Sequence, residues 1–142
     1  MSGKVIDFKK SFEVVELWLY DRGYIVNQYT DAEDSVYYNA GEILINSRKH
    51  PESKFYTLLH ECGHILINDN RDRLFNLSRE TQAIMGGPKH SRKKRVAVIS
   101  EEIEAWKRGE RLAKRLGLKI NEDKFDRCRA NAIMSYIEWA RD

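Results

Sequence analysis

His60, Glu61 and His64 form a His-Glu-x-x-His pattern inside an apolar stretch with helical spacing. On a helix, residues four positions apart lie on one face, so the two imidazoles can bind the same metal ion. Glu61 is rotated by about 100° from His60, which suits a carboxylate that takes a proton from water better than a third ligand. Zinc binds neutral imidazole nitrogens and, in catalytic sites, keeps one position open for that water. The pattern therefore predicts zinc-dependent hydrolysis with Glu61 as general base.

The residues around this pattern indicate that its polar side lines a cleft. A helix over residues 51–68 would be apolar around most of its circumference, as is typical of a buried helix. Its remaining arc contains only polar residues: Thr57, His60, Glu61, His64 and Asn68. A chance pattern on a solvent-facing helix is the alternative, but such a face usually carries Lys or Arg, and this arc has neither. Gly63, in mid-helix, indicates either close approach of a second element to the metal or ordinary tight packing.

We expect a third metal ligand on a later helix that the sequence predicts from Ser100 to Gly117. On a helical projection Glu102 lies on the apolar face, Glu101 at its edge, and Glu104 points away. A carboxylate on an apolar face is costly unless it is paired or bound to metal, so Glu102 is the predicted ligand. The alternative is an acidic first turn that interacts with the helix dipole. That alternative explains Glu101 and Glu104 well and Glu102 poorly.

The rest of the sequence predicts the elements that must position these residues. Apolar spacing predicts a helix over residues 8–20 that ends near Gly23, and a final helix capped by Asn121. Short β-type runs, at 24–26, 36–38 and 42–46, predict a small antiparallel sheet. Residues 71–85 are predicted to form a short helix, and 86–97 a basic, flexible loop. The fold class is therefore α+β, in a single domain over residues 1–142.

Composition excludes several classes of protein. The 142 residues are enough for one domain with a real core, and 42% hydrophobic with 33% charged residues is a globular balance. A net charge of +3 is too weak to indicate nucleic-acid binding by itself. No apolar run approaches the ~20 residues that span a bilayer, and the first residues form no secretory segment. Two cysteines cannot form a disulfide framework, so we expect a cytoplasmic protein without a membrane partner.

Two segments resemble a known family. Residues 58–66 (LLHECGHIL), followed by Glu102-Ile103-Glu104-Ala105, are similar to the gluzincin metallopeptidases, and most of all to the small ImmA/IrrE-type domain of phages, prophages and mobile elements. The resemblance implies a minimal zincin-like fold with a thermolysin-like core. It also implies zinc held by His60, His64 and Glu102, with a protein or peptide as substrate.

The chain departs from the family pattern at two places. Trp106 stands where the family has Asp or Asn, so an expected hydrogen bond to a histidine ligand is lost, and Glu101 or another residue would have to replace it. The spacing between the two motifs is longer than usual in the family, because residues 69–97 look like an insertion. In the family the strand before the site helix borders the cleft, a role that Glu42–Asn46 would fill as an edge strand. The donor for the developing oxyanion stays open among Tyr37, Tyr38, Tyr56, Tyr136 and His90.

Residues 89–95 contain five basic residues and no acidic one. This run indicates either contact with nucleic acid or another acidic partner, or simply a solvated loop, and the loop is the favoured interpretation. It defines the alternative function, a nonproteolytic regulatory metal-binding domain that contacts nucleic acid or a protein partner through the basic loop. A purely structural zinc site is a further alternative, but such a site has no use for Glu61.

Overall fold

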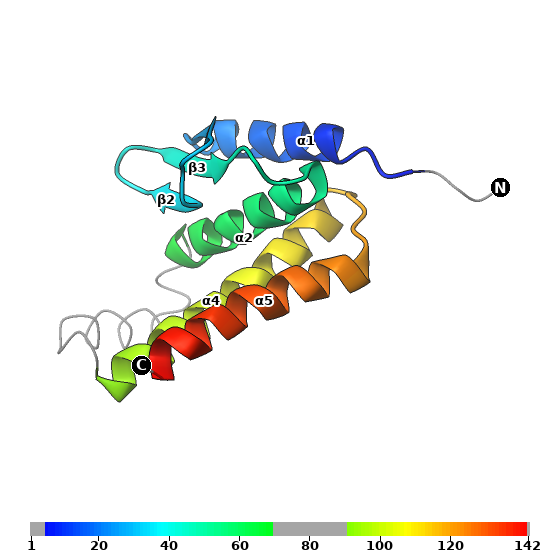
Figure 1. The fold of residues 1–142 in the computed structure, drawn as a ribbon. Helices are drawn as coiled ribbons and strands as arrows, with labels where there is room; N and C mark the ends of the chain where they lie inside the picture. The colour runs from blue at the N-terminus through cyan, green and yellow to red at the C-terminus, as the bar shows by residue number, and fades with distance from the viewer. Residues whose placement is uncertain (1–4, 70–90, 142) are drawn as a thin grey trace.

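The computed structural model describes residues 5–69 and 91–141, which form four helices and three strands. In chain order these are α1 (Phe8–Asp21), β1 (Ile25–Tyr29), β2 (Ser35–Tyr37), β3 (Glu42–Asn46), α2 (Pro51–Asp69), α4 (Arg92–Arg115) and α5 (Glu122–Arg141). Helix α2 lies in the middle, with α1 and the sheet on one side and α4 and α5 on the other (Figure 1). The predicted α+β class is confirmed, whereas the helix predicted over 71–85 lies outside the described residues.

The sheet is mixed, so the prediction of a purely antiparallel sheet is wrong. Its strand order is β1-β3-β2. Strands β2 and β3 pair in antiparallel fashion, as predicted, but β1 pairs with β3 in parallel. After β1 the chain crosses to the far side of β3, forms β2 there, and turns back, so β3 runs in the direction of β1. Strand β3 is therefore central, and Glu42–Asn46 cannot be the edge strand that we expected at the cleft; β2 is an edge strand instead.

Local sequence signals account for where most helices begin and end. Helix α1 is followed by Gly23, whose φ of +88° suits glycine, and α2 starts at Pro51, where a missing N–H costs nothing. At the start of α5 the Asn121 side chain accepts a hydrogen bond from the backbone N–H of Lys124 at 3.2 Å. These three boundaries are close to those predicted.

Helix α4 starts earlier than predicted. Its N-cap is Ser91, whose hydroxyl accepts from the backbone N–H of Lys94 at 3.2 Å, and the helix runs from Arg92. The predicted start near Ser100 is therefore wrong, and the predicted loop over 86–97 is wrong for residues 92–97, whereas residues 86–90 lie outside the described part of the chain. Lys and Arg are good helix formers. Arg95 also donates a hydrogen bond to the carbonyl oxygen of Ala140 at 2.5 Å, which joins the start of α4 to the end of α5.

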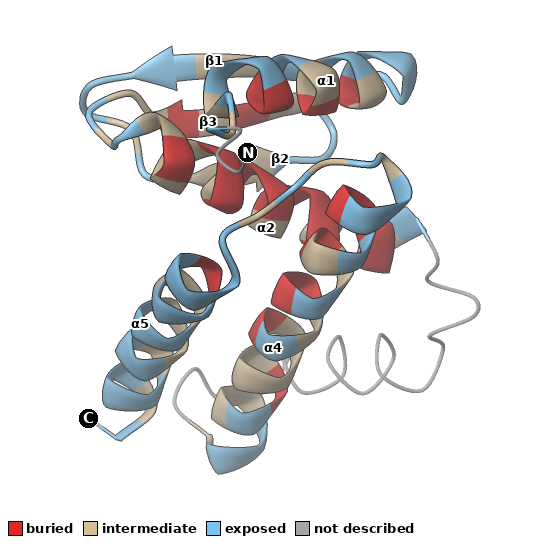
Figure 2. Ribbon diagram, turned by 90° about the vertical axis from the view of Figure 1, so that its right-hand side faces the viewer, coloured by how far each residue is buried: buried red, intermediate tan, exposed pale blue. Residues whose placement is uncertain are grey.

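Helices α2 and α4 pack at backbone contact. A Cβ added at Gly63 would clash with the backbone carbonyl of Ala105, and one added at Gly109 would clash with the carbonyl of Leu59. Both positions therefore need glycine because the two backbones approach closely. Buried residues concentrate on α2 and on the adjoining part of α4, whereas most of α5 is exposed (Figure 2). Cys62 lies two positions from each histidine, a spacing that predicts a core position on the other side of the helix, and its side chain is fully buried.

Candidate metal centre

The packing of α4 on α2 brings three possible metal ligands together. Glu102 Oε2 lies 2.7 Å from His60 Nε2, Glu102 Oε1 lies 3.1 Å from His64 Nε2, and the two Nε2 atoms are 3.1 Å apart. A tetrahedral zinc ion with bonds of about 2.0–2.1 Å needs ligand atoms roughly 3.3 Å apart. The spacing and the chemistry of these donors therefore fit a metal ion. Each of the three sequence-predicted residues contributes one corner of the cluster.

Charge and hydrogen bonding within this cluster shift two pKa values in opposite directions. Burial alone would raise the pKa of Glu102, but hydrogen bonds from His60 and His64 outweigh it and lower that pKa to about 2. Burial alone would lower the pKa of His64, but hydrogen bonds with Glu101 and Glu102 outweigh it and raise that pKa to about 10. In the metal-free protein the cluster therefore holds an ionised carboxylate next to a protonated imidazole, and a cation can replace that proton.

Glu61 is buried beside the cluster, with 4% of its surface exposed. Its Oε1 lies 3.4 Å from Nδ1 of His60, on the opposite side of that ring from the Nε2 that faces Glu102. Burial raises the pKa of Glu61, the charges of both histidines lower it, and the charge of Glu102 raises it, with a net upward shift. A carboxylate whose pKa is raised above its ordinary value is a stronger base and is better suited to accept a proton from water.

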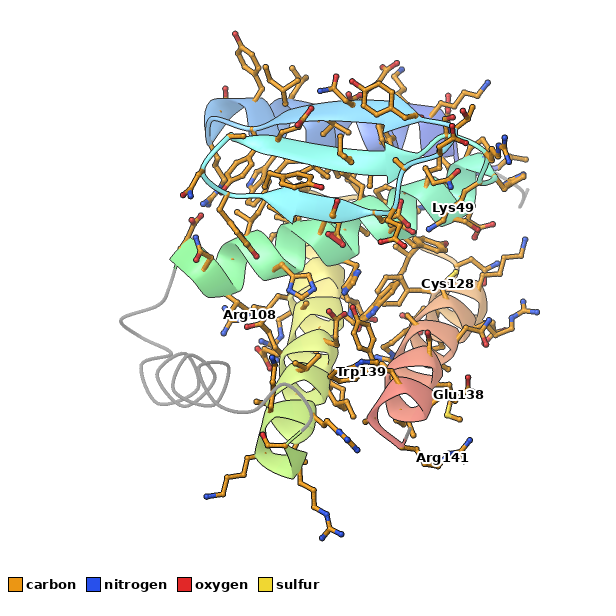
Figure 3. The ribbon with its side chains drawn as sticks, turned by 60° about the vertical axis from the view of Figure 1, so that its left-hand side comes forward. Lys49, Arg108, Cys128, Glu138, Trp139 and Arg141 are labelled. Carbon is orange, nitrogen blue, oxygen red and sulfur yellow. The ribbon has the colours of Figure 1, made fainter. Side chains whose placement is uncertain are left out.

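The neighbours of the two histidines differ. Nδ1 of His64 lies 3.4 Å from Oε2 of Glu101, the residue that the sequence offered as a substitute for the lost polar side chain. His60 instead stacks on the indole ring of Trp106. Glu104 points away from the cluster, as predicted, and pairs with Arg108 at 2.8 Å. Arg108 lies on the side of α4 away from α5 (Figure 3).

The cluster opens into a cavity of about 970 Å³. The cavity is bordered by α2, by the segment 32–36 with Tyr38, and by the inner face of α5. Figure 3 shows Lys49 beside the sheet and Cys128 near the start of α5, the two regions between which the cavity opens. At the end of the cavity near the sheet, Lys49 forms an ion pair with Asp34 and donates to Thr57 Oγ1 at 3.2 Å.

Of the five groups considered as oxyanion donors, Tyr38 and Tyr136 line this cavity. Tyr56 belongs to the core, where its hydroxyl donates to Glu52 at 2.7 Å and accepts from the backbone N–H of Asn121 at 2.8 Å. Tyr37 is half exposed and borders a different hollow. The remaining candidate, His90, lies outside the described residues.

Sequence reasoning missed the contribution of α5. The spacing of Phe125, Ala132, Tyr136 and Trp139 in the sequence predicts core packing, but only Phe125 of these four is fully buried and Trp139 is 40% exposed. Ala132 and Tyr136 instead belong to a cavity-lining face that also includes Cys128, Asn131 and Ser135. The spacing of these five residues is that of one helix face, and its mixture of polar and small side chains was the available signal.

Comparison with protein families supports the resemblance seen in the sequence. Residues 24–87 match the family model of the IrrE N-terminal-like domain (Peptidase_M78), so the chain carries a zincin-like domain of the ImmA/IrrE type. The matched segment includes the His-Glu-x-x-His pattern but ends before Glu102 and Trp106. No curated protein and no solved structure matches the chain. None of the described helices is long and apolar enough to cross a membrane.

Proposed function

We propose that this ImmA/IrrE-type chain is a zinc-dependent peptidase in which His60, His64 and Glu102 hold the metal and Glu61 is the general base. The observation that carries the proposal is the convergence of the two Nε2 atoms and the Glu102 carboxylate, with contacts of 2.7–3.1 Å, beside the buried carboxylate of Glu61 on the wall of an open cavity. Zinc, when bound, supplies a Lewis acid that lowers the pKa of water and polarises the substrate carbonyl.

Glu61 has the properties of a residue that carries a proton between water and the leaving amine. It lines the cavity, and its pKa is raised mainly by burial, which makes its carboxylate a stronger base than an exposed glutamate. The same carboxyl group can then donate that proton to the departing amine nitrogen. The neighbouring charges of His60 and His64 favour its ionised form before the reaction starts.

The sheet offers a surface for an extended peptide. Strand β2 is at the edge of the sheet, and Ser35 and Val36 line the cavity opposite the metal cluster. A peptide that pairs with the free edge of β2 would gain main-chain hydrogen bonds and would lie along the cavity. Tyr136 and Tyr38 are two tyrosine hydroxyl donors on its walls that could stabilise a developing oxyanion. Protein or peptide substrates therefore suit this site.

The alternative function gains no support from α4. Residues 92–95 of the basic run belong to this helix, and Arg95 is engaged with the carbonyl of Ala140. A regulatory domain that contacts nucleic acid through a basic loop would leave Glu61 without a role. The cytoplasmic location and the phage or prophage source stay predictions from the sequence.

The test is a digest of a peptide library by the zinc-loaded protein and its Glu61→Gln variant. We expect Glu61→Gln to keep its zinc and to lose about 10²–10⁴-fold in cleavage rate, the range typical of a lost general base. Glu104→Gln is the matched control, because it makes the same change on the far side of α4. Equal cleavage by wild type and Glu61→Gln would contradict the proposal.

A further inference from the structure

The indole of Trp106 lies flat against the imidazole of His60. Their ring centroids are 4.5 Å apart and the ring planes differ by 10°, so the two rings stack face to face. Trp106 is 3% exposed and also borders the cavity. Parallel stacking fixes the plane of an imidazole, because tilting the ring breaks the contact across its whole face. Trp106 therefore defines the plane in which His60 presents its Nε2.

The Trp106 ring is itself held firmly. The ring of Phe125, which is fully buried, meets the indole at 76° with a centroid separation of 5.5 Å. Gly63 packs against the backbone of Ala105, the residue next to Trp106, and Gly109 packs against Leu59, the residue next to His60. These two contacts fix the separation of the backbones that carry the stacked rings. Rotation of the indole would disturb the core and not only the site.

No hydrogen bond explains the position of the indole. Among the described residues, Nε1 of Trp106 is buried and has no hydrogen-bond partner. The ring is thus oriented by stacking and packing alone. The acidic neighbour of His60 Nδ1 is Glu61, at 3.4 Å, and the proposed function assigns that carboxylate to the proton of water. His64 differs, because its Nδ1 lies at the same distance from Glu101, which has no such task.

We propose that Trp106 is the positioning residue of His60: it holds this metal ligand by face-to-face stacking, in place of the hydrogen bond that usually orients a histidine ligand. The proposal rests on the metal site of the proposed function. One histidine of the cluster is then oriented by a carboxylate and the other by an aromatic ring. The environment of the indole should therefore change when metal binds, because an ion held by His60 is bonded to Nε2 of the imidazole against which the indole stacks.

The first experiment uses fluorescence. The chain has three tryptophans, so Trp18→Phe with Trp139→Phe leaves Trp106 as the single emitter. Titration of this protein with Zn²⁺, and separately with Co²⁺, is expected to change its emission until one ion is bound. The matched control is Trp106→Phe, which keeps Trp18 and Trp139 and should respond little. Metal binding without any change in Trp106 emission would overturn the proposal.

The second experiment compares side chains at position 106 by chelator competition with zinc alone. Trp106→Phe keeps an aromatic face and is expected to stay within a few-fold of wild-type affinity. Trp106→Leu keeps an apolar side chain without a flat ring and is expected to lose about 10–100-fold, as when an outer neighbour of a ligand is removed. Circular dichroism melting of the metal-free variants reports whether each one folds, and the visible absorption of bound Co²⁺ reports the ligand geometry.

The outcomes separate this inference from the proposed function. Loss of affinity in Trp106→Leu with rescue in Trp106→Phe, together with an altered Co²⁺ spectrum, supports the positioning role. Equal affinities for the two variants would overturn it, whether both are strong or both are weak. If neither variant folds, the fluorescence titration decides alone. Failure of the wild-type protein to bind zinc would instead overturn the proposed function.

Discussion

Gly63 of α2 packs directly against the backbone carbonyl of Ala105 in α4, with no room for a side chain between them. Ala105 follows Glu102 by almost one helical turn and precedes Trp106. The contact therefore sets how closely α4 presents both residues to the histidines of α2. The sequence left two interpretations open for Gly63: tight helix packing, or close approach of a second element to the candidate metal centre. The contact with Ala105 is both of these at once.

Because of this contact, we expect Gly63→Ala to destabilise the protein, the opposite of what glycine-to-alanine changes in helices usually do. Replacing glycine by alanine within a helix normally stabilises it by about 1 kcal/mol. Here the added methyl group meets backbone that cannot rotate away, so we expect destabilisation of roughly 1–3 kcal/mol, as for an overpacked core. Urea unfolding of the metal-free protein measures the change. A more stable Gly63→Ala protein would show that α2 and α4 can separate at little cost.

Alanine substitutions at Glu102, Glu101 and Glu104 should rank in that order by loss of zinc affinity. Glu102 contacts both Nε2 atoms, and its removal takes away a ligand. Glu101 contacts only the outer nitrogen of His64, so its loss should cost about 10–100-fold. Glu104 pairs with Arg108 and serves as the control. Chelator competition on the three variants gives the order, and a largest loss in Glu104→Ala would require a different site.

Tyr136→Phe should lower kcat for peptide cleavage by about 10²–10³-fold, the usual cost of losing one oxyanion donor. Tyr136 is favoured over Tyr38 because Glu102 acts on it more strongly: burial, then the charge of Glu102, then a hydrogen bond with Glu102 raise the pKa of Tyr136, so its hydroxyl stays a donor. KM should change little. Tyr37→Phe, at a half-exposed position outside the cavity, is the control. A full loss in Tyr38→Phe with none in Tyr136→Phe would transfer the role to Tyr38.

The stability of the metal-free protein should fall at both ends of the pH range. The raised pKa of His64 means that its contribution is complete below the ordinary value of 6.5 and is lost as pH rises towards about 10. The lowered pKa of Glu102 means that its contribution is present above the ordinary value of 4.5 and is lost as pH falls towards about 2.

Urea unfolding of chelator-treated protein across this range measures both losses. His64→Gln should flatten the alkaline side of the profile, whereas His50→Gln, which changes a histidine outside the cluster, should leave it unchanged. An alkaline slope that survives in His64→Gln would mean that another group is responsible.

The sequence alone determined the features that depend on neighbours along the chain. His60, Glu61 and His64 take their relative directions from the geometry of a single helix, and the apolar phase of α4 pointed to Glu102 and away from Glu104. The start of α2 at Pro51 and the cap of α5 at Asn121 also depend only on residues close in the sequence. These features were predictable because residues one to four positions apart decide them.

The tertiary structure decided what depends on contacts between distant segments. Strand β3 pairs with both β1 and β2 and so lies between them, an order that the alternation of side chains within each strand could not specify. Packing of α4 on α2 put Trp106 against His60, although the family pattern led us to expect only a lost hydrogen bond there. Packing of α5 brought Tyr136 to the cavity from 72 residues beyond His64 (136 − 64). Each result depends on which surfaces bury each other, and that is fixed only when the whole chain has packed.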